Sequence, residues 1–198
     1  MRRSVLIIAV ILVALGVGLL ILLLWGVQSY NRFVTTNEQV TAAWSQVQNQ
    51  YQRRMDLIPN IVNVVKGVAD FEKQTYVAVA EARSNAGKIT LSPELLRDPQ
   101  AFAAFERAQG ELSSALSRLL VTIERYPELK ANQNFTQLQD ELAGTENRIA
   151  VERRRFNETV QTYNVMTKRF PGTIVAFERS FARWDAVAAL PPFPRMRI

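Results

Sequence analysis

The sequence predicts an all-α protein: an N-terminal transmembrane helix followed by an elongated antiparallel bundle of about four helices. Three observations support this fold class. Residues 5–27 form one uncharged apolar run. Between residues 135 and 170 an apolar side chain recurs at every seventh position, which is typical of long helices that pack at a shallow angle, as in a coiled coil. No segment shows the apolar and polar alternation of a strand between turn signals.

Composition excludes several classes of function. The chain of 198 residues is 48% hydrophobic, which suffices for one membrane segment and one domain of ordinary size. It has no cysteine and no histidine, so thiol catalysis, disulfides, a lipoprotein anchor, structural zinc and a Ser-His-Asp triad are excluded. The formal net charge is +6, but arginines alternate with acidic residues instead of forming a one-sign block, and we expect no nucleic-acid binding.

The apolar run from Val5 to Val27 is predicted to cross a lipid bilayer. As a helix it spans about 34 Å at ~1.5 Å per residue. A secretory signal peptide has a shorter apolar region and a small-residue cleavage site, whereas Trp25 and Tyr30 suit the headgroup level of a span that is retained. Arg2 and Arg3 precede the run and place the N-terminus in the cytoplasm, with the remaining chain outside.

Three segments after residue 30 carry apolar rows at helical spacing, and each row predicts a buried helix face. In the first segment they are Trp44, Tyr51, Ile58 and Val65, and Val40, Val47, Ile61 and Val68. In the second they are Phe102, Phe105, Leu112, Leu116, Leu119 and Ile123, and in the third Phe135, Leu142, Ile149, Phe156, Tyr163 and Phe170.

Turn signals divide the chain. The first long helix is predicted to end at residues 84–87, the second at Tyr126-Pro127 and the third at 170–172, with a shorter fourth helix over 173–190. The predicted regions are thus a cytoplasmic flank (1–4), the span (5–27), the bundle (28–190) and a proline-rich tail (191–198). The tail is either frayed or a short extended segment that docks elsewhere.

Pro59 interrupts an otherwise continuous apolar helical face. A proline inside a helix removes one hydrogen bond and costs roughly 3 kcal/mol. Two explanations are open. Asp56 could cap a new helix with Pro59 in its first turn. Alternatively, Pro59 kinks a long helix, which lets the helix curve around its neighbours or directs Asn60 and Asn63 towards a partner. The kink is favoured because the apolar row passes through residue 59 without changing phase.

Charged residues supply the candidate interface positions. Arg53, Arg54, Asp56 and Lys66 flank the proline, and they form either contacts with a neighbouring subunit or a solvated helix face. Glu146, Arg148 and Glu152 lie in a second charged stretch.

A second inward row joins that stretch to the predicted core. It runs through Leu138, Thr145, Glu152, Thr159 and Met166. Polar residues in such a row fix helix register when they are paired, and Arg53 or Arg54 is the predicted partner of the acceptor on this row.

Recognised catalytic and cofactor patterns are missing. Ferritin-like metal sites need Glu-x-x-His repeats, which a chain without histidine cannot supply. A carboxylate-only manganese or magnesium site is left open by the sequence. Lys66 and Lys168 have no accompanying oxyanion loop, and there is no glycine-rich phosphate loop. We therefore expect no enzymatic activity, no cofactor and no catalytic or metal-binding residue.

Three blocks in order carry a resemblance to a known family. They are RRMDLIPNIVNVVKG, RYPELKANQNF and ELAGTENRIAVERRRFNETVQTYNVMTKRFPG, preceded by a single apolar span. From about Tyr30 to Gly172 the chain resembles the LemA family of bacterial membrane-anchored helical proteins. The resemblance implies a helical bundle on an anchor in the cytoplasmic membrane of a bacterium. It implies no enzymatic activity, and it suggests other membrane proteins, such as a metalloprotease, as partners.

Two functional hypotheses follow. The first is a non-enzymatic single-pass membrane protein whose bundle forms homo-oligomers or scaffolds other envelope proteins, because anchored copies share one plane and one orientation. The second is an adaptor or regulatory subunit of a membrane-bound protease or envelope enzyme.

Overall fold

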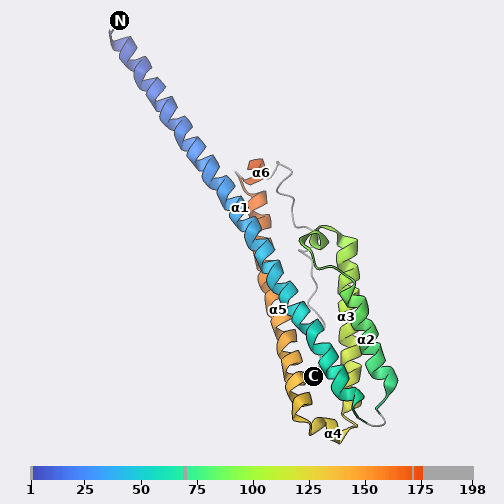
Figure 1. The fold of residues 1–198 in the computed structure, drawn as a ribbon. Helices are drawn as coiled ribbons and strands as arrows, with labels where there is room; N and C mark the ends of the chain where they lie inside the picture. Colours follow the sequence, from blue (N-terminus) through green and yellow to red (C-terminus); the bar gives the residue numbers. More distant parts are fainter. Residues whose placement is uncertain (1, 69–70, 171, 176–198) are drawn as a thin grey trace. The chain divides into compact units, whose positions relative to one another are not determined.

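The computed structural model describes residues 2–68, 71–170 and 172–175. Over these residues the elements are all helical (Figure 1), and the prediction of an all-α chain with an N-terminal apolar helix is confirmed. In chain order they are α1 (Arg2–Lys66), α2 (Lys73–Gly87), the 3₁₀ turn η1 (Pro93–Arg97), α3 (Pro99–Ile123), α4 (Pro127–Lys130), α5 (Gln133–Lys168) and α6 (Gly172–Val175).

The chain divides into two compact units, each described here by itself. Unit 1 comprises residues 1–39 and 162–183, and unit 2 comprises residues 40–161 and 184–198. Helices α1 and α5 each contribute to both units. The described part of unit 2 therefore contains the C-terminal part of α1, all of α2 and α3, and most of α5.

Unit 2 is a helical bundle around one apolar core. The core draws Ile58, Ile61 and Val65 from α1, Val79 and Ala86 from α2, Leu112, Leu116 and Leu119 from α3, and Phe135 and Leu142 from α5. The members of the rows predicted for these segments are buried, except Val68, which is half-buried, and Phe170, which is exposed. Their burial confirms the heptad interpretation of the sequence.

Unit 1 joins the start of α1 to the end of α5. From Leu6 to Val27 the side chains of α1 are exposed apart from the half-buried Gly18. Further along, Phe33 is buried and meets the ring of Tyr163 edge-on, with 6.4 Å between ring centroids. Thr36 Oγ1 lies 3.5 Å from the sulfur of Met166. Aromatic and apolar contacts therefore hold α5 against α1 in this unit.

The predicted first helix is wrong in its length. The sequence suggested one helix to residues 84–87, whereas α1 ends at Lys66 and α2 begins at Lys73. The amide of Gly67 bonds Val64 O at 3.2 Å and that of Val68 bonds Val65 O at 3.1 Å. Such short-range bonds close a helix end, and Gly67 was the overlooked stop signal. The 84–87 break itself ends α2.

The predicted fourth helix falls largely outside the described residues, which include only α6 from its range. The proline-rich tail, 191–198, also lies outside them. The bundle of unit 2 still has four main helices, α1, α2, α3 and α5. The fourth arises because α2 is separate from α1, and not from the range 173–190. Local capping fixes the other starts: Asp98 Oδ1 accepts the amides of Gln100 and Ala101 ahead of α3, and Asn132 Oδ1 accepts that of Phe135 in α5.

Candidate functional site

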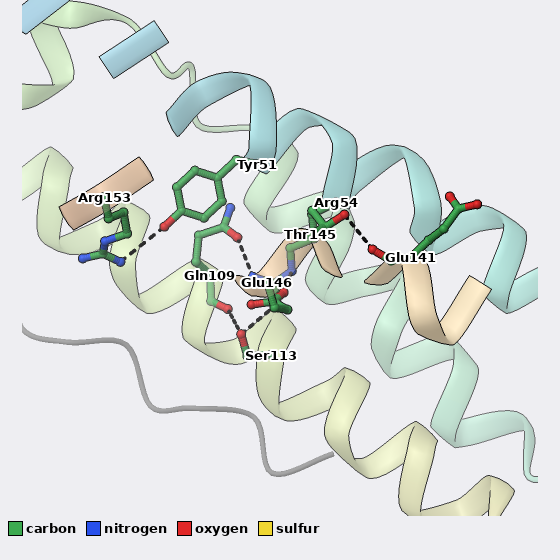
Figure 2. Close-up of polar contacts among 8 residues, drawn as sticks. All are labelled: Tyr51, Arg54, Gln109, Ser113, Glu141, Thr145, Glu146 and Arg153. Atoms are coloured by element: carbon green, nitrogen blue, oxygen red, sulfur yellow. Dashed lines mark hydrogen bonds and ion pairs between the residues drawn. The ribbon is translucent and has the colours of Figure 1, made fainter. Parts of the chain in front are cut away.

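A buried arginine lies at the centre of unit 2. The side chain of Arg54, on α1, is 0% exposed although arginine is almost never fully buried without partners. Figure 2 shows it between α3 and α5. Its Nη2 donates to Ser113 Oγ at 2.7 Å and its Nη1 to Gln109 Oε1 at 3.3 Å. Its Nε lies 2.8 Å from Glu146 Oε1, an ion pair without the geometry of a hydrogen bond.

A second buried arginine lies nearby on α5. Arg153 Nη2 pairs with Glu106 Oε1 at 2.8 Å. Its Nη1 donates to the hydroxyl of Tyr51 at 3.3 Å, as Figure 2 shows. The ring of Tyr51 also meets Phe105 edge-on at 5.1 Å. We call Arg54, Glu146, Gln109, Ser113, Arg153, Glu106 and Tyr51 the polar centre. It joins α1, α3 and α5 through hydrogen bonds and ion pairs.

Burial dominates the electrostatics of the polar centre. It raises the pKa of the Glu146 carboxyl above its usual 4.5, while the charge of Arg54 acts in the opposite direction. It also lowers the pKa of the Arg54 guanidinium from its usual range, against the pull of Glu146. Burial likewise raises the pKa of Tyr51 above 10.0, opposed by Arg153. Each charge is thus held in a medium that disfavours it, and its partners offset that cost.

The polar centre corrects two expectations. Arg54 is part of the bundle interior, so the solvated-face interpretation is wrong for this residue. The predicted acceptor Glu152 pairs with Arg155 on its own helix at 2.8 Å, and the partner of Arg54 is Glu146. On the predicted inward row, Thr145 is buried and its hydroxyl donates to Glu141 O at 2.8 Å (Figure 2).

Two candidate residues line one surface groove of unit 2. Arg53 from α1 and Arg148 from α5 are exposed, although Arg53 directly precedes the buried Arg54 in the chain. They border a groove of about 770 Å³. We call this the charged groove, and its remaining lining residues are Lys130, Ala131, Gln133, Thr136, Gln137, Asp140, Glu141 and Gly144. It therefore carries both basic and acidic groups on one face.

The other candidates around the proline are exposed and engaged locally. Asp56 accepts a hydrogen bond from Gln52 Nε2 at 2.9 Å. Lys66 Nζ lies 5.5 Å from the ring centroid of Tyr76, a cation–π distance. Asn60 is exposed. Asp56 therefore does not cap a new helix.

Pro59 lies inside α1, which passes through it from Arg2 to Lys66. The interpretation that Pro59 opens a new helix is therefore wrong. Proline has no amide, so the carbonyl of Met55, four residues earlier, loses its usual partner. Arg83 Nε, from α2, donates to Met55 O at 2.9 Å. The proline thus frees a carbonyl that α2 uses as a docking point, which offsets the lost hydrogen bond.

Sequence reasoning missed several members of the polar centre. Gln109 and Ser113 interrupt the apolar stripe of α3, at four and eight residues after Phe105, and that interruption was the available signal. Arg153 lies seven residues after Glu146 on α5, the spacing that places both on one face. No sequence signal identified Arg83, because its partner is a backbone carbonyl.

The candidate membrane anchors lie at the start of the chain, on α1. Over the described residues, α1 is the one helix long and apolar enough to cross a membrane. Arg2 and Arg3 lie in its first turn, and Trp25 and Tyr30 are 44% and 47% exposed. The apolar stretch indicates a membrane location. Within the part of the chain that the structure describes, no group of three or more acidic side chains is placed to hold a metal ion.

Comparison with known proteins agrees with these features. The chain is 29% identical over 170 residues to magnetosome protein MamQ of Magnetospirillum gryphiswaldense, a match that covers 78% of this chain and 62% of the relative. Two MamQ proteins of Paramagnetospirillum magneticum are 28% identical over the same shares. The match thus spans less than two thirds of these relatives. The family model for LemA matches residues 43–190, and the chain belongs to the LemA family.

Proposed function

We propose that this protein is a non-enzymatic, single-pass protein of a bacterial cytoplasmic membrane whose helical bundle assembles with further copies of itself. The apolar part of α1 is the anchor, the N-terminus is cytoplasmic, and unit 2 is outside. The assembled bundles then act as a scaffold for other envelope proteins.

The charged groove is the observation that carries this proposal. Its lining combines Arg53, Lys130 and Arg148 with Asp140 and Glu141. A surface with both signs of charge can pair with a second copy of itself, because basic groups of one copy face acidic groups of the other. The buried charges of the polar centre are already paired within the chain, whereas the exposed Arg53 and Arg148 of the groove can reach a partner.

The membrane anchor makes weak contacts sufficient. Copies held in one bilayer share an orientation and move in two dimensions, which raises their effective concentration. Surface ion pairs contribute little individually, under about 1 kcal/mol each. Several of them in one groove, between anchored copies, support assembly where the same contacts between free domains would not.

The test is the mass of the full chain in nanodiscs or mild detergent. We expect the wild type to form oligomers and the double variant Arg53→Glu/Arg148→Glu to shift towards monomers, because both substitutions place like charges opposite Asp140 and Glu141. Arg118→Glu is the matched control, since Arg118 is exposed on α3 of the same unit and outside the groove. A monomeric wild type contradicts the proposal.

The same variants distinguish the adaptor hypothesis. If the wild type is monomeric but co-purifies with one different membrane protein at fixed stoichiometry, and Arg53→Glu alone removes that protein, the groove serves a heteromeric partner such as a protease. Asn60→Ala, beside the proline, tests whether that partner also contacts the exposed face of α1.

A further inference from the structure

Two residues after the end of helix α5, an exposed aromatic side chain breaks the pattern of the heptad row. In the heptad row of α5, Phe156 and Tyr163 are 0% exposed. The next member, Phe170, is 76% exposed. A large apolar side chain so exposed is a candidate for contact with lipid when it lies beside an apolar span.

Phe170 lies beside the end of such a span. Its ring centroid lies 6.1 Å from that of Trp25, the tryptophan at the end of the apolar part of α1. The two ring contacts within unit 1 run in opposite directions along the chain: Tyr163 meets Phe33, and Phe170 meets Trp25. The chain after Tyr163 therefore approaches the apolar span and reaches it at the level of its aromatic belt.

The charges near Phe170 fit the surface of a bilayer. Lys168 and Arg169 directly precede it and are exposed, and Arg32 is exposed on α1 of the same unit. Among the described residues of unit 1, Glu38 is the single acidic residue. Basic side chains next to an exposed aromatic ring are the combination that binds anionic headgroups while the ring enters the interface.

From these contacts we propose that residues 168–170 form a second membrane contact, in which Phe170 inserts beside Trp25 at the bilayer interface and Lys168 and Arg169 bind anionic lipid headgroups. The proposal rests on the proposed membrane anchor. It adds that the end of α5 is attached to the same lipid surface as α1, so the bilayer holds two helices of unit 1.

Single-cysteine labelling tests this cleanly, because the chain has no cysteine of its own. An environment-sensitive fluorophore is placed at Phe170→Cys, Leu15→Cys or Thr35→Cys of the full chain. Each variant is reconstituted in vesicles of phosphatidylcholine alone or mixed with phosphatidylglycerol. Lipids with a nitroxide at the headgroup or deep in the acyl chain then quench labels at the corresponding depths.

Thr35 is the matched water-facing control. It is exposed on α1, ten residues beyond Trp25, or about 15 Å along the helix at ~1.5 Å per residue. We expect headgroup nitroxide to quench most of the Phe170 label and little of the Thr35 label. Phosphatidylglycerol should increase quenching at Phe170, and Lys168→Gln/Arg169→Gln should abolish that increase.

The Leu15 label distinguishes failure of the proposed anchor from failure of the second membrane contact. Leu15 lies in the middle of the apolar run, and deep nitroxide should quench it. If the Leu15 label is not quenched, the proposed anchor is wrong. If it is quenched while labels at Phe170 and Thr35 respond alike, the second membrane contact is wrong and the anchor stands. Equal quenching of Phe170 with and without phosphatidylglycerol would overturn the role of anionic lipid.

Discussion

The two parts of helix α1 distribute polarity in opposite ways. Near its start the helix exposes apolar residues such as Leu15, 65% exposed, whereas further along it buries the charged side chain of Arg54. Each arrangement is unfavourable in water and acceptable in its own surroundings. Lipid covers an exposed apolar helix, and a set of fixed hydrogen-bond partners makes a buried charge tolerable. The environment of each turn therefore decides what its side chains do, even within one continuous helix.

The largest expected effect comes from breaking the polar centre. Arg54→Ala leaves Glu146 charged in a largely buried position without its partner, and we expect a loss of about 3 kcal/mol in the free energy of unfolding. Urea unfolding of the full chain in detergent, followed by near-UV circular dichroism, measures it. Arg53→Ala, at the exposed neighbour, should change stability by less than ~0.5 kcal/mol. Equal losses in both variants would show that burial of Arg54 has no energetic consequence.

The double variant Arg54→Met/Glu146→Leu sharpens the same comparison. It removes both charges and keeps most of the side-chain volume, so we expect it to recover much of the stability that Arg54→Ala loses. The oligomeric state and the near-UV spectrum then report whether helix register survives without the ion pair. A double variant as unstable as Arg54→Ala would argue against the pair as the source of the effect.

A smaller effect is expected at the proline. Arg83→Ala leaves the carbonyl of Met55 without its donor, at a cost of about 1–2 kcal/mol in unfolding free energy. In the background of Pro59→Ala, the restored amide at position 59 can bond Met55 O, so the same Arg83→Ala substitution should cost less. A double-mutant cycle by urea unfolding gives the coupling between the two sites. Strictly additive losses would contradict the link between Pro59 and Arg83.

Titration of Glu146 should make the free energy of unfolding depend on pH. Because its pKa is raised in the folded state, the folded protein binds more protons than the unfolded chain above pH 4.5, and stability falls as pH rises through the folded pKa. Glu146→Gln cannot ionise at this position. Stability of the wild type minus that of the variant should therefore decrease with rising pH from 4.5 upwards. An increasing difference would show that Arg54 outweighs burial at this carboxyl.

The smallest effect is expected for an ion pair in water. Arg125 and Glu72 pair at 2.9 Å, with side chains 65% and 50% exposed. The distance in this pair is similar to that between Arg54 and Glu146, but solvent screens the exposed pair. Arg125→Ala should cost under about 1 kcal/mol in unfolding free energy and less still at high salt. A loss as large as that of Arg54→Ala would remove the distinction between buried and exposed pairs.

Much of the fold could be predicted because it depends on repetition. Apolar residues at every seventh position specify a buried face whatever the partners are, and the row from Phe135 to Tyr163 is buried as expected. The end of α1 was not recognised, because Val64, Val65 and Val68 continue the apolar pattern and conceal the stop at Gly67. A periodic pattern reports which face is buried better than where a helix ends.

The sequence by itself determined the helical class, the apolar span and the buried rows, because these follow from local spacing and composition. Tertiary structure alone decided that Arg54 is buried while Arg53 is exposed, and that Glu146 is the partner of Arg54. It also decided that Arg83 donates a hydrogen bond to the Met55 carbonyl that Pro59 leaves without an amide partner. Those outcomes depend on which groups distant segments bring within hydrogen-bond reach. A charged side chain can be buried only where such partners converge, and no single helix contains that information.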